Sequence, residues 1–386
     1  MATGILVDSS SAPLKRGAAF YRPELDALRF FACLSVFIHH SGGTRNFIVT
    51  NPWTRPVQKA GVFGVCLFFL LSAYLITELL WKEKDRTGSI HLRSFYVRRI
   101  LRIWPLYFGC ILLYVVLIPF FPGATAHPYM LLALLFMAGN WYFAARGWVN
   151  FAIDPVWSIS VEEQFYLLVP TIAKFGGKRA IWILSIFFLI AAQLMLLFLG
   201  LHHVSGAPGV WTNSIVQFQF FAAGCILALV LKDRQTVWNS GLVRLAAFLL
   251  GLIFWGIAGD SFRLLGGYPA EPSAFGLCAG YGLVLIGTVL LFLAVYGISS
   301  RWIPRWAIYL GKISFGLYLF QGFTFDLAQH SLATPYINKL KHHLPVADLL
   351  IEIGLTLLAA ALSYRFFEKP FLRLKNRFAI ILSRPA

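Results

Sequence analysis

The first apolar run of the sequence, residues 26–40, contains the ionisable side chains Arg29 and His40, eleven residues apart. Such groups are costly inside a membrane and usually functional. Eleven helical residues make three turns plus about 20°, so both side chains share one helix face, about 16 Å apart along the axis. Arginine binds anions, and an imidazole can act as a general base at neutral pH. The pair predicts a groove with a cation at its mouth and a proton acceptor deeper inside.

A second basic group enters the third apolar run, where Arg98, Arg99 and Arg102 follow one another closely. Arg99 and Arg102 are neighbours on a helix surface, and Arg98 is one turn from Arg102. Three guanidinium groups repel one another unless they bind an anion, and the planar guanidinium matches phosphate in a bidentate manner. Ordinary anchoring at the membrane surface would explain a basic cluster, but it would not explain this helical phasing. The cluster therefore predicts a phosphate site.

A third group lies at residues 154–166, where Glu162 and Glu163 are followed by a glutamine. One acid near a helix start is favoured by the helix dipole, but two acids beside a tryptophan exceed that need. In a partly dry site a carboxylate can orient and stabilise a histidine. Glu78 and Glu352 are solitary, so we expect them to be structural partners of an arginine, a lysine or a hydroxyl.

The amino-acid composition indicates that these side chains lie in a membrane protein. Of 386 residues, 59% are hydrophobic and 13% are charged, whereas soluble domains have about 45–50% and about 25%. This excludes soluble globular, disordered and disulfide-scaffold proteins. The net charge of +17 is spread between apolar runs, so it indicates membrane orientation and no nucleic-acid partner. No spacing among the five cysteines indicates a zinc site or a disulfide frame, and we expect no metal.

Hydrophobic runs long enough to be candidate spans recur along the chain. They lie near residues 26–40, 61–81, 103–122, 130–145, 159–175, 180–200, 212–231, 241–258, 275–298, 307–325 and 348–367. If 130–145 is re-entrant or interfacial, one side of the membrane receives 26 Lys and Arg residues and the other receives 7. This asymmetry places both termini in the cytoplasm. The predicted fold is an all-α polytopic membrane protein with about ten transmembrane helices plus one non-spanning segment.

Six motifs in order resemble the bacterial acyltransferase 3 family of integral membrane acyltransferases. The motifs occupy residues 21–29, Arg29 to His40, 68–77, 99–107, 157–166 and 311–319, and Glu368-Lys369-Pro370 follows them. There are departures: the second-span motif reads Ser72-Ala73-Tyr74 instead of Ser-Gly-Phe, and Gln321 stands where the family often has histidine. We expect the extracytoplasmic esterase-like domain that many relatives carry to be absent. The expected domains are a cytoplasmic tail at 1–20, the membrane acyltransferase domain at 21–370 and a basic tail at 371–386.

The resemblance implies that the chain moves an acyl group, usually acetyl, from cytoplasmic acyl-CoA to a hydroxyl of a carbohydrate, glycolipid or surface polysaccharide at the bacterial inner membrane. It implies His40 as general base or as the carrier of an acyl-histidine, with Glu162 orienting the imidazole and Glu163 as the alternative. The donor would be bound by the arginines of the two basic groups and by neighbouring motif residues. These donor-binding residues are Arg29, Arg98, Arg99, Arg102, Tyr107, Ser72 and Trp157.

Two other functions fit parts of this pattern. A multi-span transporter or flippase for an anionic or glycolipid substrate would also need buried carboxylates and a basic mouth, but no inverted repeat is evident. A non-catalytic subunit of a polysaccharide-assembly complex is disfavoured by the intact ionisable set. The acceptor, the acyl chain length and the oligomeric state are not specified by the sequence.

Overall fold

The computed structural model describes residues 21–40, 55–120, 125–149, 152–204, 206–232, 234, 236–262, 264, 273–328 and 346–381. Within these ranges every regular element is helical and none is a strand. The predicted N-terminal tail at 1–20 lies outside the described residues. The long helices are α1 (Pro23–His40), α4 (Gly64–Thr87), α5 (Leu92–Leu117), α8 (Trp157–Leu201), α9 (Ser214–Val230), α10 (Gly241–Asp260), α11 (Ala274–Val295), α13 (Ser314–Asp326) and α15 (Val346–Leu362).

Short helices and single turns connect these long helices. The short ones are α3 (Arg55–Ala60), α6 (Pro128–Leu135), α7 (Gly139–Arg146), α12 (Arg305–Lys312) and α16 (Lys369–Lys375). Turns of 3-10 or π type lie at Gly61–Phe63, Ile118–Phe120, Asp154–Val156, Gly206–Val210, Ser300–Trp302, Ser363–Glu368 and Asn376–Phe378.

Six helical stretches of the described chain are long and apolar enough to cross a membrane. They are Pro56–Thr87, Leu92–Phe120, Asp154–Leu201, Gly241–Asp260, Ala274–Val295 and Leu349–Phe378. The structure thus confirms the all-α class with several membrane-length helices, and it recovers fewer of them than the ten spans expected. Part of the difference is that α9 has only 17 residues and α13 only 13. In addition, α1 carries Glu24, Asp26 and Arg29 within 18 residues, which lowers its hydropathy.

Helix α8 covers two of the predicted spans, 159–175 and 180–200. Its backbone leaves the helical region at Gly177, where φ is 65° and ψ is −161°. A positive φ strains residues with a side chain but not glycine, so the break falls at a residue that tolerates it. Each arm of α8 is about as long as the roughly 20 residues that a span needs.

The segment predicted not to span, 130–145, consists of the two short helices α6 and α7. Each has eight residues, which rise about 12 Å against a hydrocarbon core of about 30 Å. The turn between them passes through Met137, which has a positive φ of 54°. Buried Asn140 fixes α7, because its Nδ2 donates to the Thr212 carbonyl at 3.0 Å and to Ser214 Oγ at 2.9 Å. Neither helix is long enough to cross a membrane alone.

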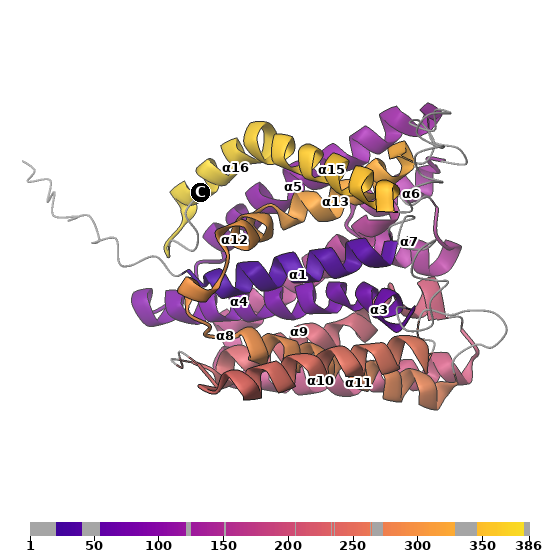
Figure 1. Cartoon of the computed structure of the whole chain (residues 1–386). Coiled ribbons are helices and arrows are strands. Elements are labelled where there is room, and N and C mark those ends of the chain that lie inside the picture. Colours follow the sequence, from indigo (N-terminus) through magenta and orange to yellow (C-terminus); the bar gives the residue numbers. More distant parts are fainter. Residues whose placement is uncertain are drawn as a thin grey trace, which may run out of the picture.

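Helix α4 lies in the centre of the bundle and is largely buried, whereas α10 and α11 pair along one flank and α15 and α16 lie on the opposite flank (Figure 1). Helix α1 runs beside α4 and also packs on α12 and α13. Glycines allow the closest approaches: a Cβ at Gly311 would lie 1.8 Å from the Asp26 carbonyl oxygen of α1. This packing turns the Arg29 face of α1 toward α4, α5 and α8.

Candidate functional site

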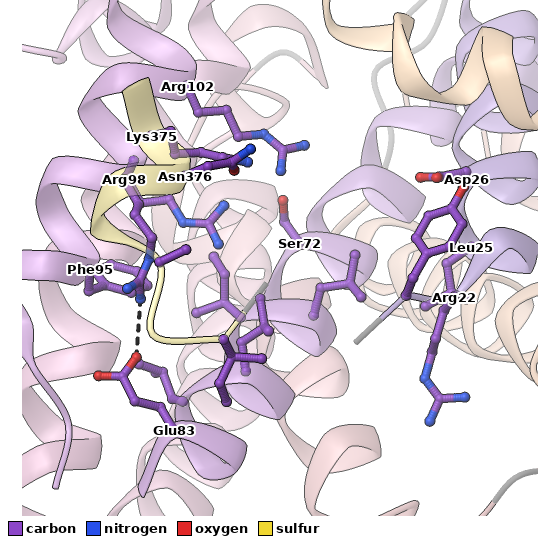
Figure 2. Close-up of a pocket in the computed structure, with 18 of the residues that line it drawn as sticks. Arg22, Leu25, Asp26, Ser72, Glu83, Phe95, Arg98, Arg102, Lys375 and Asn376 are labelled. Carbon is purple, nitrogen blue, oxygen red and sulfur yellow. Dashed lines mark hydrogen bonds and ion pairs between the residues drawn. The ribbon is translucent and has the colours of Figure 1, made fainter. Parts of the chain in front are cut away.

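A cavity opens at the end of the bundle where α1 begins, and we call it the outer vestibule. Its walls come from α1, α4, α5 and the segment after α15. The polar and charged residues that line it are Tyr21, Arg22, Asp26, Arg29, Ser72, Glu83, Arg98, Arg99, Arg102, Lys375 and Asn376. Figure 2 shows the basic side chains of α5 and of the C-terminal segment on one wall, facing Ser72 and α1.

A second cavity, the inner chamber, continues from the vestibule between α1, α4, α5, α8 and α13. The two cavities share Arg29, Ser72, Arg99 and Arg102 as lining residues, so these four form a neck between them. Beyond the neck the chamber walls are mainly aromatic and hydroxyl side chains. These are Phe68, Phe69, Ser158, Tyr166, Ser314, Phe315 and Tyr318, together with Glu162.

Three residues of α8 reach the inner chamber because they stand four apart. Ser158, Glu162 and Tyr166 share one helix face. The Glu162 carboxylate accepts hydrogen bonds from Ser72 Oγ and Tyr166 OH, and these two hydroxyls are 2.9 Å apart. At the chamber's far end, Ser158 Oγ lies 2.9 Å from the Tyr318 hydroxyl. This row gives the chamber one carboxylate and several hydroxyl groups.

The arginines at the neck are held by aromatic and electrostatic contacts. The Arg99 guanidinium lies 5.2 Å from the centre of the Tyr166 ring and 5.4 Å from that of Phe95. Arg29 and Arg99 are both attracted to Glu162, and Arg29 and Arg102 repel each other. The buried Nε–H of Arg29 has no hydrogen-bond partner within the described part of the chain. Glu368 also attracts Arg102, so three cations face two carboxylates here, which leaves a net positive charge.

Arg98 is engaged differently from Arg99 and Arg102. Its Nη2 donates to buried Glu83 of α4 at 3.1 Å, and its Nη1 donates to the Phe378 carbonyl at 2.9 Å. The ion pair with Glu83 is drawn in Figure 2. Glu83 also accepts from the backbone N–H of His91 at 2.7 Å. Arg98 lines the vestibule, but its guanidinium joins three segments of the chain.

Two of the predicted donor-binding residues, Tyr107 and Trp157, line neither cavity. The Tyr107 hydroxyl is buried and donates to the Leu134 carbonyl at 2.8 Å. Trp157 is buried between Phe69 and Trp211, with ring centres 6.0 and 5.7 Å away. These contacts hold α5 to α6, and α8 to α4 and the segment before α9. They do not place Tyr107 or Trp157 at the cavity expected to bind the donor.

The two adjacent glutamates of α8 point in different directions, as their 100° separation requires. Glu163 leaves the chamber face and accepts a hydrogen bond from Trp104 Nε1 at 3.2 Å. The next residue, Gln164, donates to Asn140 Oδ1 at 2.9 Å and so ties α8 to α7. Among the acids of this motif, only Glu162 lines the chamber.

His40 is the last residue of α1 and is not among the residues that line the vestibule or the chamber. Its ring lies 5.0 Å from that of His39, whose Nδ1 lies 2.9 Å from the Gln58 carbonyl. The Glu162 carboxylate accepts its hydrogen bonds from Ser72 and Tyr166, so it lies in the chamber beside the neck. Its contacts do not favour the expected role of orienting the His40 imidazole.

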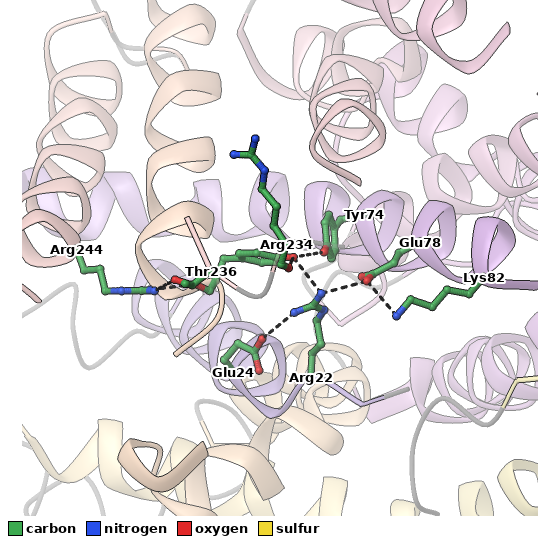
Figure 3. Close-up of polar contacts among 9 residues, drawn as sticks. Arg22, Glu24, Tyr74, Glu78, Lys82, Arg234, Thr236 and Arg244 are labelled. Atoms are coloured by element: carbon green, nitrogen blue, oxygen red, sulfur yellow. Dashed lines mark hydrogen bonds and ion pairs between the residues drawn. The ribbon is translucent and has the colours of Figure 1, made fainter. Parts of the chain in front are cut away.

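A separate polar network fixes the start of α1 (Figure 3). Arg22 Nη2 donates to Glu78 Oε1 at 3.1 Å and to the Tyr296 hydroxyl at 3.0 Å. Lys82 lies 3.5 Å from the same Glu78 oxygen, which agrees with the structural role expected for Glu78. Burial alone would lower the pKa of Arg22, but Tyr74 and Glu78 outweigh it and raise the pKa. Arg22 therefore stays charged as an anchor of α1 at the vestibule wall.

Several lining residues were not predicted from the sequence. Ser158 and Tyr166 could have been found from their four-residue spacing around Glu162. Tyr318 lies within the 311–319 motif, whereas Lys375 and Asn376 come from a distant segment that no local pattern marks. All five cysteines are free, and the described residues contain no group of three or more His, Cys, Asp or Glu side chains placed to hold a metal ion.

Comparison with known proteins places this arrangement in a family. A family model described as an acyltransferase domain (Acyl_transf_3) matches residues 22–367, which include α1 through α15. The chain is a member of the acyltransferase 3 family. The chamber, the neck arginines and α1 to His40 all fall within the matched region, whereas α16 lies beyond it.

The curated relatives are annotated by name as acetyltransferases. The chain is similar to the O-acetyltransferase OatA of Staphylococcus aureus, with 29% identity over 379 residues, 91% of this chain and 57% of the relative. It is also similar to a putative O-acetyltransferase of Staphylococcus aureus, with 29% identity over 381 residues and the same coverage. The chain thus spans little more than half the length of these relatives. No solved structure matches it significantly.

Proposed function

We propose that the protein is a membrane O-acyltransferase that moves an acyl group, in the simplest case acetyl, from cytoplasmic acyl-CoA to a hydroxyl of a carbohydrate, glycolipid or surface polysaccharide. Membership of the acyltransferase 3 family and similarity to proteins named O-acetyltransferases support the reaction class. The observation that carries the donor assignment is the convergence of Arg29, Arg99 and Arg102 on one neck. Guanidinium groups bind phosphate strongly, and CoA carries several phosphates.

The two cavities suggest how the donor lies. Its phosphates would occupy the basic vestibule, and its thin arm would pass the neck into the inner chamber. The chamber has mostly aromatic walls and few charges, which suits an uncharged arm and a small acyl group. Arg98, tied to Glu83 and Phe378, would shape the vestibule. Glu162, with Ser72 and Tyr166, would set the spacing and charge of the neck.

His40 is the proposed catalytic residue, on the same face of α1 as Arg29. Its imidazole would take the proton of the acceptor hydroxyl while the oxygen attacks the thioester carbonyl. The carbon–sulfur bond would then break, and the departing CoA thiolate would take the proton from the imidazolium. Alternatively, the imidazole would attack the thioester itself and pass the acyl group on. Either route uses the histidine at neutral pH.

The proposed setting is the bacterial inner membrane, with about ten spans, both termini in the cytoplasm and residues 21–370 as the membrane acyltransferase domain. The 26 to 7 distribution of Lys and Arg supports this orientation. It puts the vestibule in contact with the cytoplasm, where acyl-CoA is made. His40, at the far end of α1, would then meet an acceptor that arrives from the opposite side.

A donor-hydrolysis and transfer assay tests the proposal. Purified protein in lipid nanodiscs is given radiolabelled acetyl-CoA and a panel of glycan and glycolipid acceptors. Labelled acceptor together with free CoA is the expected result, and acceptor-dependent transfer should disappear in a His40→Ala protein. Transport of the same acceptors across vesicles with no CoA release would instead support a transporter.

A further inference from the structure

The chain after α15 returns to the mouth of the vestibule. Helix α16 packs against α5, and the residues after it follow the same wall. Four residues of this segment, Lys375, Asn376, Ala379 and Ile381, line the vestibule. Figure 2 shows Lys375 and Asn376 beside Arg98 and Arg102. The segment from 369 to 381, which we call the C-terminal strap, therefore forms part of the cavity wall.

The strap is held in place by a bond that does not depend on its side chains. Arg98 Nη1 donates to the backbone carbonyl of Phe378 at 2.9 Å, while Nη2 of the same guanidinium pairs with Glu83 at 3.1 Å. Because Glu83 is buried on α4 and Arg98 is on α5, the strap is joined to both walls of the vestibule. The hydrogen bond from Arg98 to Phe378 fixes the strap three residues after Lys375.

The basic side chains of the strap differ in whether they face the solvent or the cavity. Arg373 and Arg377 are exposed, whereas Lys375 is half-buried and faces the cavity. Lys375 repels Arg98, Arg99 and Arg102, all of which are near it. Burying a fourth cation among three others is unfavourable unless an anion binds there. A positively charged membrane anchor would have no reason to turn Lys375 toward the cavity and Arg373 and Arg377 outward.

We propose that the C-terminal strap is the outer wall of the donor site and that Lys375 binds the donor's phosphates together with Arg99 and Arg102. The strap lies beyond the family match, which ends at residue 367, and largely within the predicted basic tail. The inference rests on the proposed function for the identity of the donor. The inference adds that the affinity of the protein for the donor's phosphates depends on Lys375, which lies outside the predicted membrane domain.

The test compares two single-charge changes on the same seven-residue helix in the full-length protein. Lys375→Gln removes the inward charge, and Arg373→Gln removes an exposed one as a matched control. We expect the dissociation constant for CoA, measured by calorimetry in nanodiscs, to rise about tenfold to a hundredfold for Lys375→Gln, as for loss of a charged hydrogen bond. Arg373→Gln should stay within about twofold of wild type, as exposed ion pairs contribute little.

Further variants and a second probe separate the possible outcomes. Lys375→Arg should keep affinity near wild type, and Arg98→Gln should weaken CoA binding by releasing the strap. Pyrophosphate should show the same Lys375 dependence. Equal CoA affinity for Lys375→Gln and Arg373→Gln would overturn the proposal and leave the acyltransferase assignment intact. If pyrophosphate binds in a manner that depends on Lys375 but CoA does not bind, the phosphate-binding role of the strap stands and the assignment of CoA as donor is overturned. Binding of neither probe by wild type would overturn both.

Discussion

The contact between Gly311 of α12 and Asp26 of α1 allows a quantitative test of the packing around the site. In a Gly311→Ala protein the new Cβ would lie 1.8 Å from the Asp26 carbonyl oxygen and 2.5 Å from its carbonyl carbon. Ordinary contact begins at 3.4 Å, so one backbone would have to move by about 1.6 Å because no side chain can rotate away. Overpacking costs about 1–3 kcal/mol, and alanine's better helix propensity returns at most about 1 kcal/mol.

Gly282→Ala is the matched control, because a Cβ at Gly282 of α11 has no atom within 4 Å. Thermal unfolding in detergent should show a lower midpoint for Gly311→Ala and an unchanged or higher one for Gly282→Ala. The displacement should also weaken CoA binding, since Arg29 and Ser314 each follow the contact by three residues and line the inner chamber. If Gly311→Ala unfolds at the wild-type midpoint, this description of the α1–α12 packing is wrong.

Four other predictions concern the site. His40→Ala should reduce acyl transfer by about a hundredfold or more with an unchanged melting temperature, while His39→Ala should be milder; residual turnover above about a tenth would contradict the assignment. Glu162→Gln should lower turnover more than donor affinity, because Glu162 is the only carboxylate among the described residues that line the chamber; an effect on affinity alone would refute this. Arg102→Lys should weaken CoA binding by about 1.5–3 kcal/mol, because lysine cannot reproduce a bidentate guanidinium; titration showing equal affinities would exclude Arg102. A cysteine at position 154 should react with an impermeant reagent from outside the cell, and labelling only from the cytoplasm would reverse the topology.

The convergence of Arg29, Arg99 and Arg102 could be predicted from the sequence for a local reason. Helical spacing fixes which residues share a face, and the membrane fixes the depth of each charged residue along its helix. Helices α1, α4 and α5 line the same cavities. Residues of α1 and α5 that lie at a similar depth in the membrane and face the cavity therefore come together. Residues 130–145 also differ from the other runs in the sequence itself, since Gly139 and Asn140 interrupt a short apolar run.

The environment of each glutamate could not be predicted, because it depends on which helices pack beside α8. Glu162 meets the Ser72 hydroxyl, and Glu163 meets Trp104 of α5. The aromatic motif residues Tyr107 and Trp157 are buried in helix contacts, and their residue types alone do not distinguish packing from binding. Lys375 falls in the expected basic tail, because a short segment in which basic residues alternate with uncharged ones contains no signal for its return to the vestibule.

The gathering of cations around the vestibule couples the stability of the fold to binding. Repulsion among Arg98, Arg99, Arg102 and Lys375 favours unfolding, and an anion that binds only the folded protein opposes it. A ligand present at a hundred times its dissociation constant raises the free energy of unfolding by about 2.7 kcal/mol, a substantial part of the roughly 5–15 kcal/mol typical of a folded domain. The cell's supply of a bound polyanion would thus influence how long this protein persists as well as how fast it works.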